Sequence, residues 1–268
     1  MNFFIIPPRG SLTLSHLGTN SYFCLAQQYM KDPEYRKFFL ELPKDAWVCL
    51  DNGVGDFEPI TAKELLDVAI ELKPNEVIPP DVLFDSVRTC LNLTTFLIEK
   101  AKHKELDNTE ILFVPQGNTF STYMECYKFG LEHSGVNTIG LSKITVPYVF
   151  YGVKADVGIM ESRHSCFNYL KVMGLLKKPI HLLGAGSPLE FKYYAEHDTE
   201  KVIRSNDSCN SIWSAINEIK WKEGNFQRIT TPRNYFDLEL THEQEKIAID
   251  NIFYLHRITN QPYGKSNE

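Results

Sequence analysis

Short apolar runs alternate along the chain with longer segments in which apolar residues recur every three or four positions. The first pattern predicts buried β-strands, and the second predicts amphipathic helices. Each of six runs leads to a carboxylate, an amide or a glycine: 47–50 to Asp51, 76–80 to Asp81, 111–115 to Gln116, 137–139 to Gly140, 180–183 to Gly184, and 202–203 to Asp207. Helical spacing covers residues 62–72, 86–102, 120–133, 189–200 and 241–258.

The first part of the chain has a weaker pattern. Residues 3–6 and 12–15 are predicted as two short strands, because prolines and a glycine break regular structure between them. Residues 21–42 are predicted as two helices separated at Asp32. Alternating strands and helices favour parallel pairing through right-handed crossovers. Eight strands in all predict a (β/α)8 TIM barrel, with a doubly wound open sheet as the alternative.

The composition fits this architecture. The chain has 268 residues, 43% of them hydrophobic, which suffices for one large core and is a common length for one α/β barrel. We therefore expect a single domain over residues 1–268. Within it, we expect a long basic insertion or loop at 141–178 and a disordered tail at 261–268.

The charge is unevenly distributed. The net charge of −6 does not suggest nucleic-acid binding, but residues 141–178 contain six basic and two acidic residues and so carry +4. This segment is either a phosphate-binding face or a solvated surface. Its basic residues are Lys143, Lys154, Arg163, Lys171, Lys177 and Lys178; Lys143, Arg163, Lys177 and Lys178 are the candidates we name for nucleic-acid binding.

The cysteines argue against a metal site. The six are scattered, with no C-x-x-C pair and no histidine at ligand spacing, and several lie in apolar runs. We expect small buried thiols in a reducing compartment and no metal ligands. The opening residues are too short and insufficiently basic for a signal peptide, and no run is long enough for a membrane span. A soluble, cytoplasmic protein is therefore expected.

Strand-end residues of a parallel barrel meet at one mouth, so Asp51, Asp81, Gln116, Gly140 and Asp207 should lie together. Asp207 is the candidate nucleophile, although it could instead cap a helix that begins near residue 210. Two carboxylates facing one anomeric carbon suit glycosyl transfer, with one attacking and one shuttling protons. A further acid, an amide and a backbone glycine suit the edge of a purine-like base.

Six short strings resemble those of the tRNA-guanine transglycosylase superfamily, whose members exchange guanine for a 7-deazaguanine on an α/β barrel. The resemblance covers residues 47–210. Lys178-Pro179-Ile180-His181-Leu182-Leu183-Gly184-Ala185-Gly186-Ser187-Pro188 is similar to K-P-H-Y-L-M-G-V-G-K-P. The other strings are Leu50-Asp51-Asn52-Gly53 (T-D-S-G-G), Pro80-Asp81 (F-D-E), Pro115-Gln116-Gly117-Asn118 (Q-Q-G), Ile139-Gly140-Leu141 (V-G-G-L) and Asn206-Asp207-Ser208-Cys209 (F-D-C).

This resemblance implies a role for each matched residue. Asp207 would be the nucleophile and Asp51 a proton-transfer group, while Asp81, Gln116, Gly140 and Leu141 would bind the base. The family's Cys-x-Cys-x-x-Cys…His zinc element and its T-R-x-G-R-N-G tRNA-binding loop are both missing from this sequence.

A compact barrel without the zinc subdomain resembles the phage-type DNA 7-deazaguanine transglycosylases, the DpdA group. Residues 203–208 and 32–35 are similar to that group. The resemblance implies exchange of guanine in DNA for a free 7-deazaguanine such as preQ0, without a cofactor, in the host cytoplasm if the protein is phage-encoded. Three alternatives remain open: a tRNA transglycosylase, a non-catalytic nucleic-acid-binding subunit of a transglycosylase, and a retaining glycosidase with its carboxylates roughly 5 Å apart.

Overall fold

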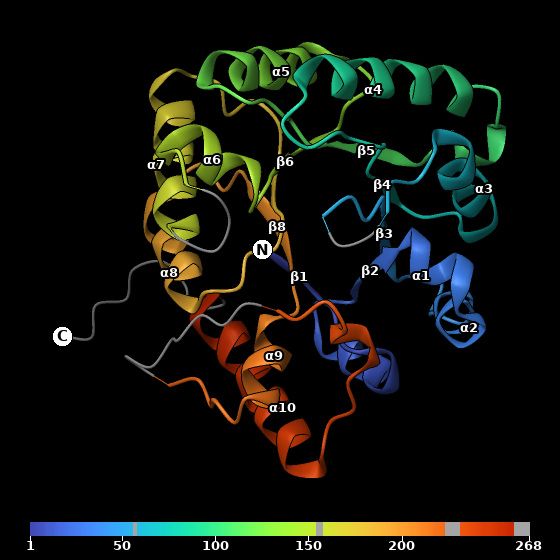
Figure 1. Cartoon of the computed structure of the whole chain (residues 1–268). Helices are drawn as coiled ribbons and strands as arrows, with labels where there is room; N and C mark the ends of the chain where they lie inside the picture. Colours follow the sequence, from blue (N-terminus) through green and yellow to red (C-terminus); the bar gives the residue numbers. More distant parts are fainter. Residues whose placement is uncertain (56–57, 154–157, 223–230, 260–268) are drawn as a thin grey trace.

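The computed structural model describes residues 1–55, 58–153, 158–222 and 231–259. At its centre, eight parallel strands form a nearly closed barrel (Figure 1) in the hydrogen-bonded order β1-β8-β7-β6-β5-β4-β3-β2. The strands are β1 (Asn2–Ile5), β2 (Ser21–Leu25), β3 (Trp47–Asp51), β4 (Glu76–Val77), β5 (Glu110–Phe113), β6 (Thr138–Leu141), β7 (Ile180–Leu182) and β8 (Ile203–Ser208). The predicted TIM barrel is confirmed.

The two end strands of this order, β1 and β2, face each other across the remaining gap. The Phe3 backbone N–H donates to Thr19 Oγ1 at 2.8 Å, just before β2 begins. The rings of Phe4 and Phe23 pack edge to face with their centroids 5.8 Å apart. The Thr19 N–H also donates to Phe3 O at 3.4 Å, so hydrogen bonds at Thr19 and packing of the two rings together bring these edges into contact.

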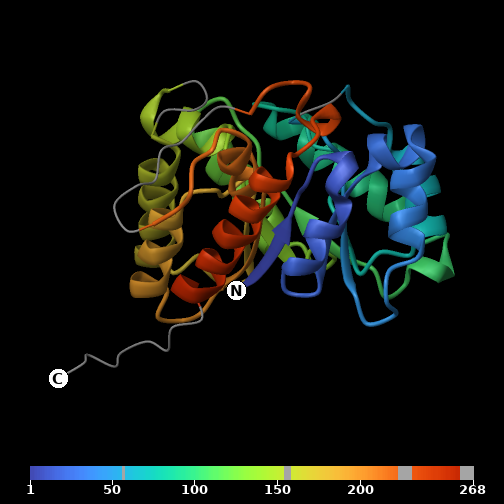
Figure 2. The same ribbon diagram turned by 90° about the horizontal axis from the view of Figure 1, so that it is seen from below.

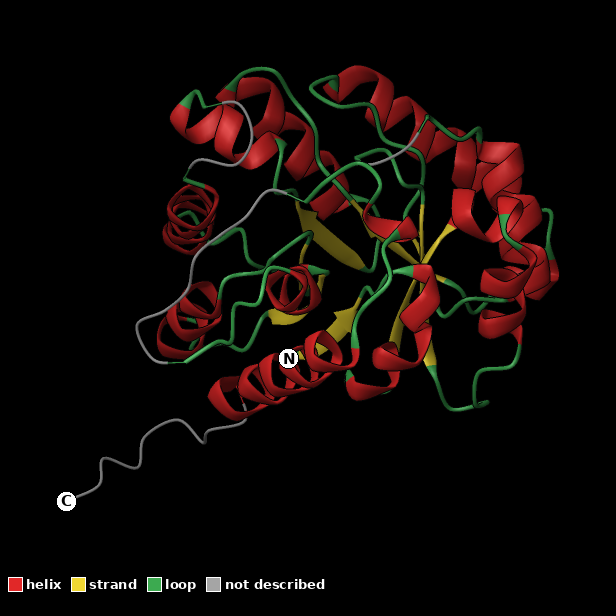
Figure 3. Cartoon of the chain, turned by 60° about the horizontal axis from the view of Figure 1, so that its bottom comes forward, coloured by secondary structure: helices red, strands yellow, loops and turns green. Residues whose placement is uncertain are grey.

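Helices surround the strands (Figure 3). They are α1 (Ala26–Lys31), α2 (Pro33–Leu40), α3 (Ala62–Leu72), α4 (Ser86–Lys100), α5 (Phe120–Glu132), α6 (Thr145–Tyr151), α7 (Ile159–Val172), α8 (Pro188–His197), α9 (Asn210–Ile216) and α10 (His242–Thr259), with 3-10 turns at Arg9–Leu17, Lys104–Leu106 and Tyr235–Asp237. Helix α10 lies beside α9 (Figures 1 and 2), and Asn251 Nδ2 donates to Ser211 O at 3.0 Å. At the start of α10, Thr241 and Gln244 form a capping box through two reciprocal hydrogen bonds.

The interior of the barrel has an apolar side and a polar side. Phe4, Phe23, Cys49, Ile78 and Leu112 form an apolar cluster from β1 to β5. The other side, built by β7 and β8, carries buried polar side chains: His181, Ser205 and Asp207. Because burying a polar group costs free energy unless it is hydrogen-bonded, this side needs an internal network of bonds.

That network begins at a bulge in β8. Ile180 pairs with Ile203 and His181 pairs with Ser205, so Arg204 is the extra residue. Its guanidinium makes two hydrogen bonds, of 2.9 and 2.6 Å, to the fully buried Glu76 carboxylate, and a third of 3.0 Å to Thr138 Oγ1. Glu76 and Thr138 are the first residues of β4 and β6. The ion pair therefore occupies the N-terminal end of the barrel and leaves the C-terminal end for a ligand.

Two sequence predictions are wrong at the level of elements. Residues 12–15 lie in a 3-10 turn rather than a strand, and residues 21–25 form strand β2 rather than the start of a helix. All five residues of β2 are buried, so the strand lacks the alternation that would have marked it. The segment 141–178, expected to be a long basic insertion or loop, contains helices α6 and α7. The tail predicted to be disordered, 261–268, lies outside the described residues.

Candidate functional site

A cavity of about 1050 Å³ opens at the C-terminal ends of the strands. Four predicted site residues line it: Asp51, Asp81, Gln116 and Asp207. They come from β3, β8 and the loops after β4 and β5, which lie far apart in the sequence. Of the five residues predicted to meet at the mouth, these four share one cavity, and Gly140 is not among its described lining residues.

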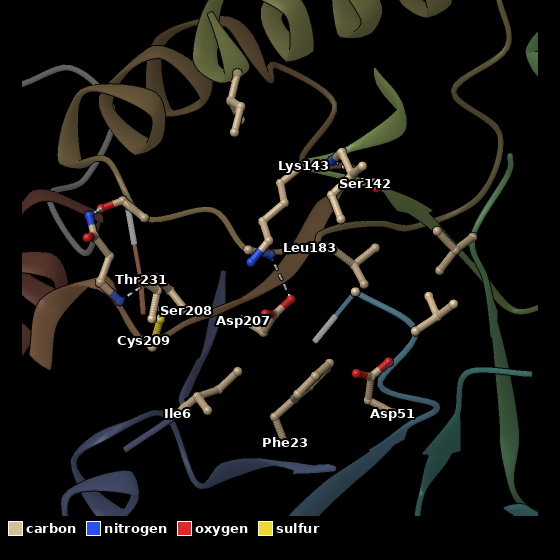
Figure 4. A pocket seen from close by; sticks show the side chains of 18 of the residues that line it. Ile6, Phe23, Asp51, Ser142, Lys143, Leu183, Asp207, Ser208, Cys209 and Thr231 are labelled. Atoms are coloured by element: carbon tan, nitrogen blue, oxygen red, sulfur yellow. Dashed lines mark hydrogen bonds between the residues drawn. The ribbon is translucent and has the colours of Figure 1, made fainter. Parts of the chain in front are cut away.

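Asp207 lies within β8, one residue before its end, and only 7% of its surface is exposed. Its Oδ1 accepts two hydrogen bonds, from His181 Nε2 at 3.0 Å and from the Gly184 backbone N–H at 3.0 Å. Figure 4 shows the Asp207 carboxylate inside the pocket. The helix-cap alternative does not apply, because Ser208 Oγ accepts from the Asn210 N–H at the start of α9. With Oδ1 fixed by two donors, Oδ2 is the oxygen available to attack.

His181 is a site residue that sequence reasoning missed. It is fully buried, and its ring is parallel to that of Phe23, with centroids 6.0 Å apart. Its Nδ1 lies 2.8 Å from Ser205 Oγ, which accepts from Arg204 Nε at 3.1 Å. Ser205 can therefore donate its own hydrogen to Nδ1, which places the imidazole proton on Nε2, facing Asp207. The sequence signal was only a histidine in an apolar run, because the role of His181 depends on its pairing with Ser205, which stands two residues before Asp207 on the same face of β8.

Asp81 is the centre of a second polar cluster. Its Oδ1 accepts from Asn52 Nδ2 at 2.8 Å, and its Oδ2 accepts from Gln116 Nε2. Gln116 Oε1 in turn accepts from Thr145 Oγ1. Burial raises the pKa of the Asp81 carboxyl to about 6, although both side-chain hydrogen bonds oppose the shift. Gln116 therefore holds the Asp81 carboxylate in position, and Asp81 lines the cavity as a hydrogen-bond acceptor.

Asp51 ends β3 and is partly exposed. Figure 4 shows its carboxylate in the same space as Asp207, with Phe23 between the two. The next residue, Asn52, is buried and holds Asp81. The C-terminal end of β3 therefore contributes one residue near Asp207 and one residue that holds Asp81.

Gly140 and Leu141 are not among the described residues that line the cavity. A Cβ on Gly140 would lie 2.5 Å from Leu183 Cδ1 and 2.9 Å from Leu112 Cδ2, so this glycine permits close packing inside the barrel. The side chain of Leu141 is fully buried in the core between sheet and helices, and its carbonyl accepts from the Leu183 N–H at 3.1 Å. The structure thus gives this pair a packing role and does not support the expected contact with a base.

The predicted basic face is wrong for most of its members. Arg163 is fully buried and paired with Glu190, with Nε 2.7 Å from Oε1. Lys177 and Lys178 precede β7 and so lie at the end of the barrel opposite the mouth, where Lys178 donates to the Gly130 and His133 carbonyls. Lys171 donates to His197 O and Thr199 Oγ1. Lys154 lies outside the described residues.

Lys143 alone among the four named candidates reaches the mouth as an extended side chain (Figure 4). The described basic residues that line the cavity are Lys31, Lys143, Arg163 and Arg233. Charge counting along the sequence found Lys143 but overlooked Lys31 and Arg233, because these residues belong to other segments. Positive charge at the mouth is therefore supplied by three separate parts of the chain, together with the buried Arg163.

A scan against protein-family models and a search of curated proteins both find no match. Among the described residues, no helix is long and apolar enough to cross a membrane. No group of three or more His, Cys, Asp or Glu in the described chain is arranged to hold a metal ion. Function must therefore be inferred from the chemistry of the barrel mouth, because a TIM barrel by itself supports many reactions.

Proposed function

We propose that the protein is a base-exchanging transglycosylase that replaces guanine in DNA with a 7-deazaguanine through a covalent bond to Asp207. The observation that carries the proposal is the division of one cavity into two sites. One holds a carboxylate by two donors on the same oxygen, and the other holds Asp81 between two amides. A nucleophile for C1′ beside an acceptor for a base edge is what base exchange requires.

In the proposed first step, Asp207 Oδ2 forms a bond to C1′ of the target nucleoside while the C1′–N9 bond breaks. The electron pair of that bond passes to guanine, which takes a proton from Asp51. A 7-deazaguanine then enters, gives its N9 proton to Asp51 and attacks C1′ through N9, so that Asp207 leaves as a carboxylate. Two displacements retain the β-configuration and restore both acids.

The cavity is large enough for this reaction. Its volume of about 1050 Å³ is slightly above the range of roughly 300–1,000 Å³ for small-molecule pockets. Such a space suits a flipped-out nucleotide rather than a base alone. Flipping costs about a few kcal/mol, which phosphate contacts have to offset. Lys31 and Arg233 at the mouth are the candidates for those contacts.

The choice of DNA over tRNA is supported by the missing zinc element and the missing Arg-bearing loop. The test is to incubate the protein with labelled guanine or labelled 7-deazaguanine and with duplex DNA, single-stranded DNA or tRNA. Label should enter DNA. Entry of label into tRNA alone would overturn the choice of DNA as the substrate. Release of guanine without incorporation of label would indicate hydrolysis instead of exchange.

Base binding should depend on pH through Asp81. Guanine and 7-deazaguanine present N1–H and 2-amino donors, which the ionised carboxylate can accept but the protonated acid satisfies less well. Because burial raises the pKa of Asp81 to about 6, the anion predominates only above that pH. The dissociation constant of the free base should therefore fall as the pH rises from about 5 to about 7.

Calorimetric titration of wild type and Asp81→Asn across this pH range checks the prediction. The variant should bind about 1.5–3 kcal/mol more weakly at pH 7, with little pH dependence, since it loses a hydrogen-bond acceptor that carries charge. Asp107→Asn, at an exposed position, is the matched control. Equal affinity of the Asp81 variant and the control would remove Asp81 from the base site.

A further inference from the structure

The Lys143 side chain packs against Gly184, a position that has no room for a side chain of its own. Its stem lies across Gly184: a Cβ there would be 2.3 Å from Lys143 Cδ and 3.1 Å from Cε. Gly184 also has a positive φ of 61°, which disfavours any side chain. The same glycine donates its N–H to Asp207 Oδ1 at 3.0 Å. The Lys143 stem therefore runs directly beside the backbone that holds the nucleophile.

The segment that carries Lys143 is also fixed to the base side of the cavity. Ser142 Oγ accepts from the N–H groups of Ile144 and Thr145, at 3.0 and 3.2 Å. Thr145 Oγ1 then donates to Gln116, which donates to Asp81. Figure 4 shows the Lys143 side chain extending from this segment toward Asp207. The Lys143 side chain thus runs from a segment bonded to the Asp81 cluster toward the nucleophile.

We infer that Lys143 is a further catalytic residue, whose ammonium group stabilises the negative charge that moves from Asp207 to the departing base. This inference depends on the proposed base exchange. Before reaction the charge is on the Asp207 carboxylate; as the Oδ2–C1′ bond forms and the C1′–N9 bond breaks, it passes to the purine. A cation beside this path accelerates the step by interacting more strongly with the charge on the departing base than with the Asp207 carboxylate, because an equal interaction with both states would leave kcat unchanged. Lys143 keeps its proton, and Asp51 supplies the proton that guanine takes.

This role differs from the phosphate contact that charge counting suggested for Lys143. Loss of a phosphate contact raises KM for the polynucleotide and reduces the salt dependence of binding. Loss of a group that stabilises the transition state lowers kcat. The two roles therefore affect different kinetic constants, and one substitution distinguishes them.

The test compares Lys143→Met with Lys177→Met, a control at an exposed position on the opposite end of the barrel. We expect kcat for base exchange in DNA to fall about 100-fold in the Lys143 variant, the loss typical of one such donor, with KM within about threefold. The control should match wild type. Thermal melts establish that both variants are folded.

A second substrate isolates the charge. In DNA containing 7-methylguanine, the base is already cationic and leaves as a neutral molecule, so Lys143→Met should reduce its release only a few-fold. Propylammonium should also partly restore exchange by Lys143→Ala. Equal losses on guanine and 7-methylguanine without amine rescue would show a structural role, and a raised KM with unchanged kcat would show a phosphate contact. Absence of exchange by wild type would instead overturn the proposed function.

Discussion

Asp207→Asn is expected to reduce base exchange more than about a hundredfold while leaving the fold intact. The amide oxygen can occupy the position of Oδ1 and still accept from His181 Nε2 and the Gly184 N–H. An NH2 group then takes the place of Oδ2, and an amide nitrogen at that position cannot form the ester with C1′. Because both hydrogen bonds survive, the variant removes the attacking charge with little structural change. Single-turnover exchange of labelled base measures the loss.

The covalent intermediate gives an independent measurement. Wild type incubated with an end-labelled oligonucleotide and no incoming base should retain label on a denaturing gel, and Asp207→Asn should not. Asp107→Asn controls for an Asp-to-Asn change at an exposed turn. Residual exchange above about a hundredth of the wild-type rate, or a stable adduct in the Asp207 variant, would assign the nucleophile to another residue.

The sequence was most informative where barrel geometry repeats. A buried strand that ends on a polar residue delivers that residue to the mouth, whichever strand it is. This rule placed Asp51, Asp81, Gln116 and Asp207 in one cavity without any knowledge of their contacts. It could not predict which groups are already hydrogen-bonded to each other. Gln116 was expected to face the base, but its amide is bonded to Asp81 and Thr145.

The rule failed for residues whose environment depends on pairing. Strand β2 was predicted as helix because Tyr22, Leu25 and Tyr29 have helical spacing, and pairing with β3 outweighs that local preference. His181 was visible as a histidine in an apolar run, but its role follows from its register with Ser205 in β8. Register and strand pairing are long-range properties that one sequence does not reveal.

Charge counting was the least reliable guide. It treated residues 141–178 as one basic surface, whereas helices α6 and α7 distribute these residues over the core, the mouth and the opposite end of the barrel. Arg163 shows the difference most clearly. Its Nη2 donates to Glu190 Oε2 at 2.8 Å and its Nη1 to the Leu183 carbonyl at 2.6 Å, and the side chain is entirely buried.

Arg163→Met should therefore lower the free energy of unfolding by roughly 3–5 kcal/mol, because it leaves the buried Glu190 carboxylate unpaired. Lys177→Met, at an exposed position, should change it by no more than about 0.5 kcal/mol. Urea denaturation of both variants provides the measurement. If Arg163 were a surface phosphate contact, its loss would leave unfolding unchanged and lower the salt dependence of DNA binding instead.

The double variant Arg163→Met with Glu190→Leu separates two contributions to the free energy of unfolding: the cost of leaving the Glu190 carboxylate unpaired, and the net stabilisation by the ion pair. Replacing both members of a buried ion pair by apolar residues is often neutral or stabilising, so the double variant should regain most of the stability lost by the single one. Arg163 also binds the carbonyl of Leu183, next to the glycine that holds Asp207. Exchange activity should therefore stay low in the double variant even as its stability recovers. Recovery of both together would show that Arg163 supports the fold but does not position the nucleophile.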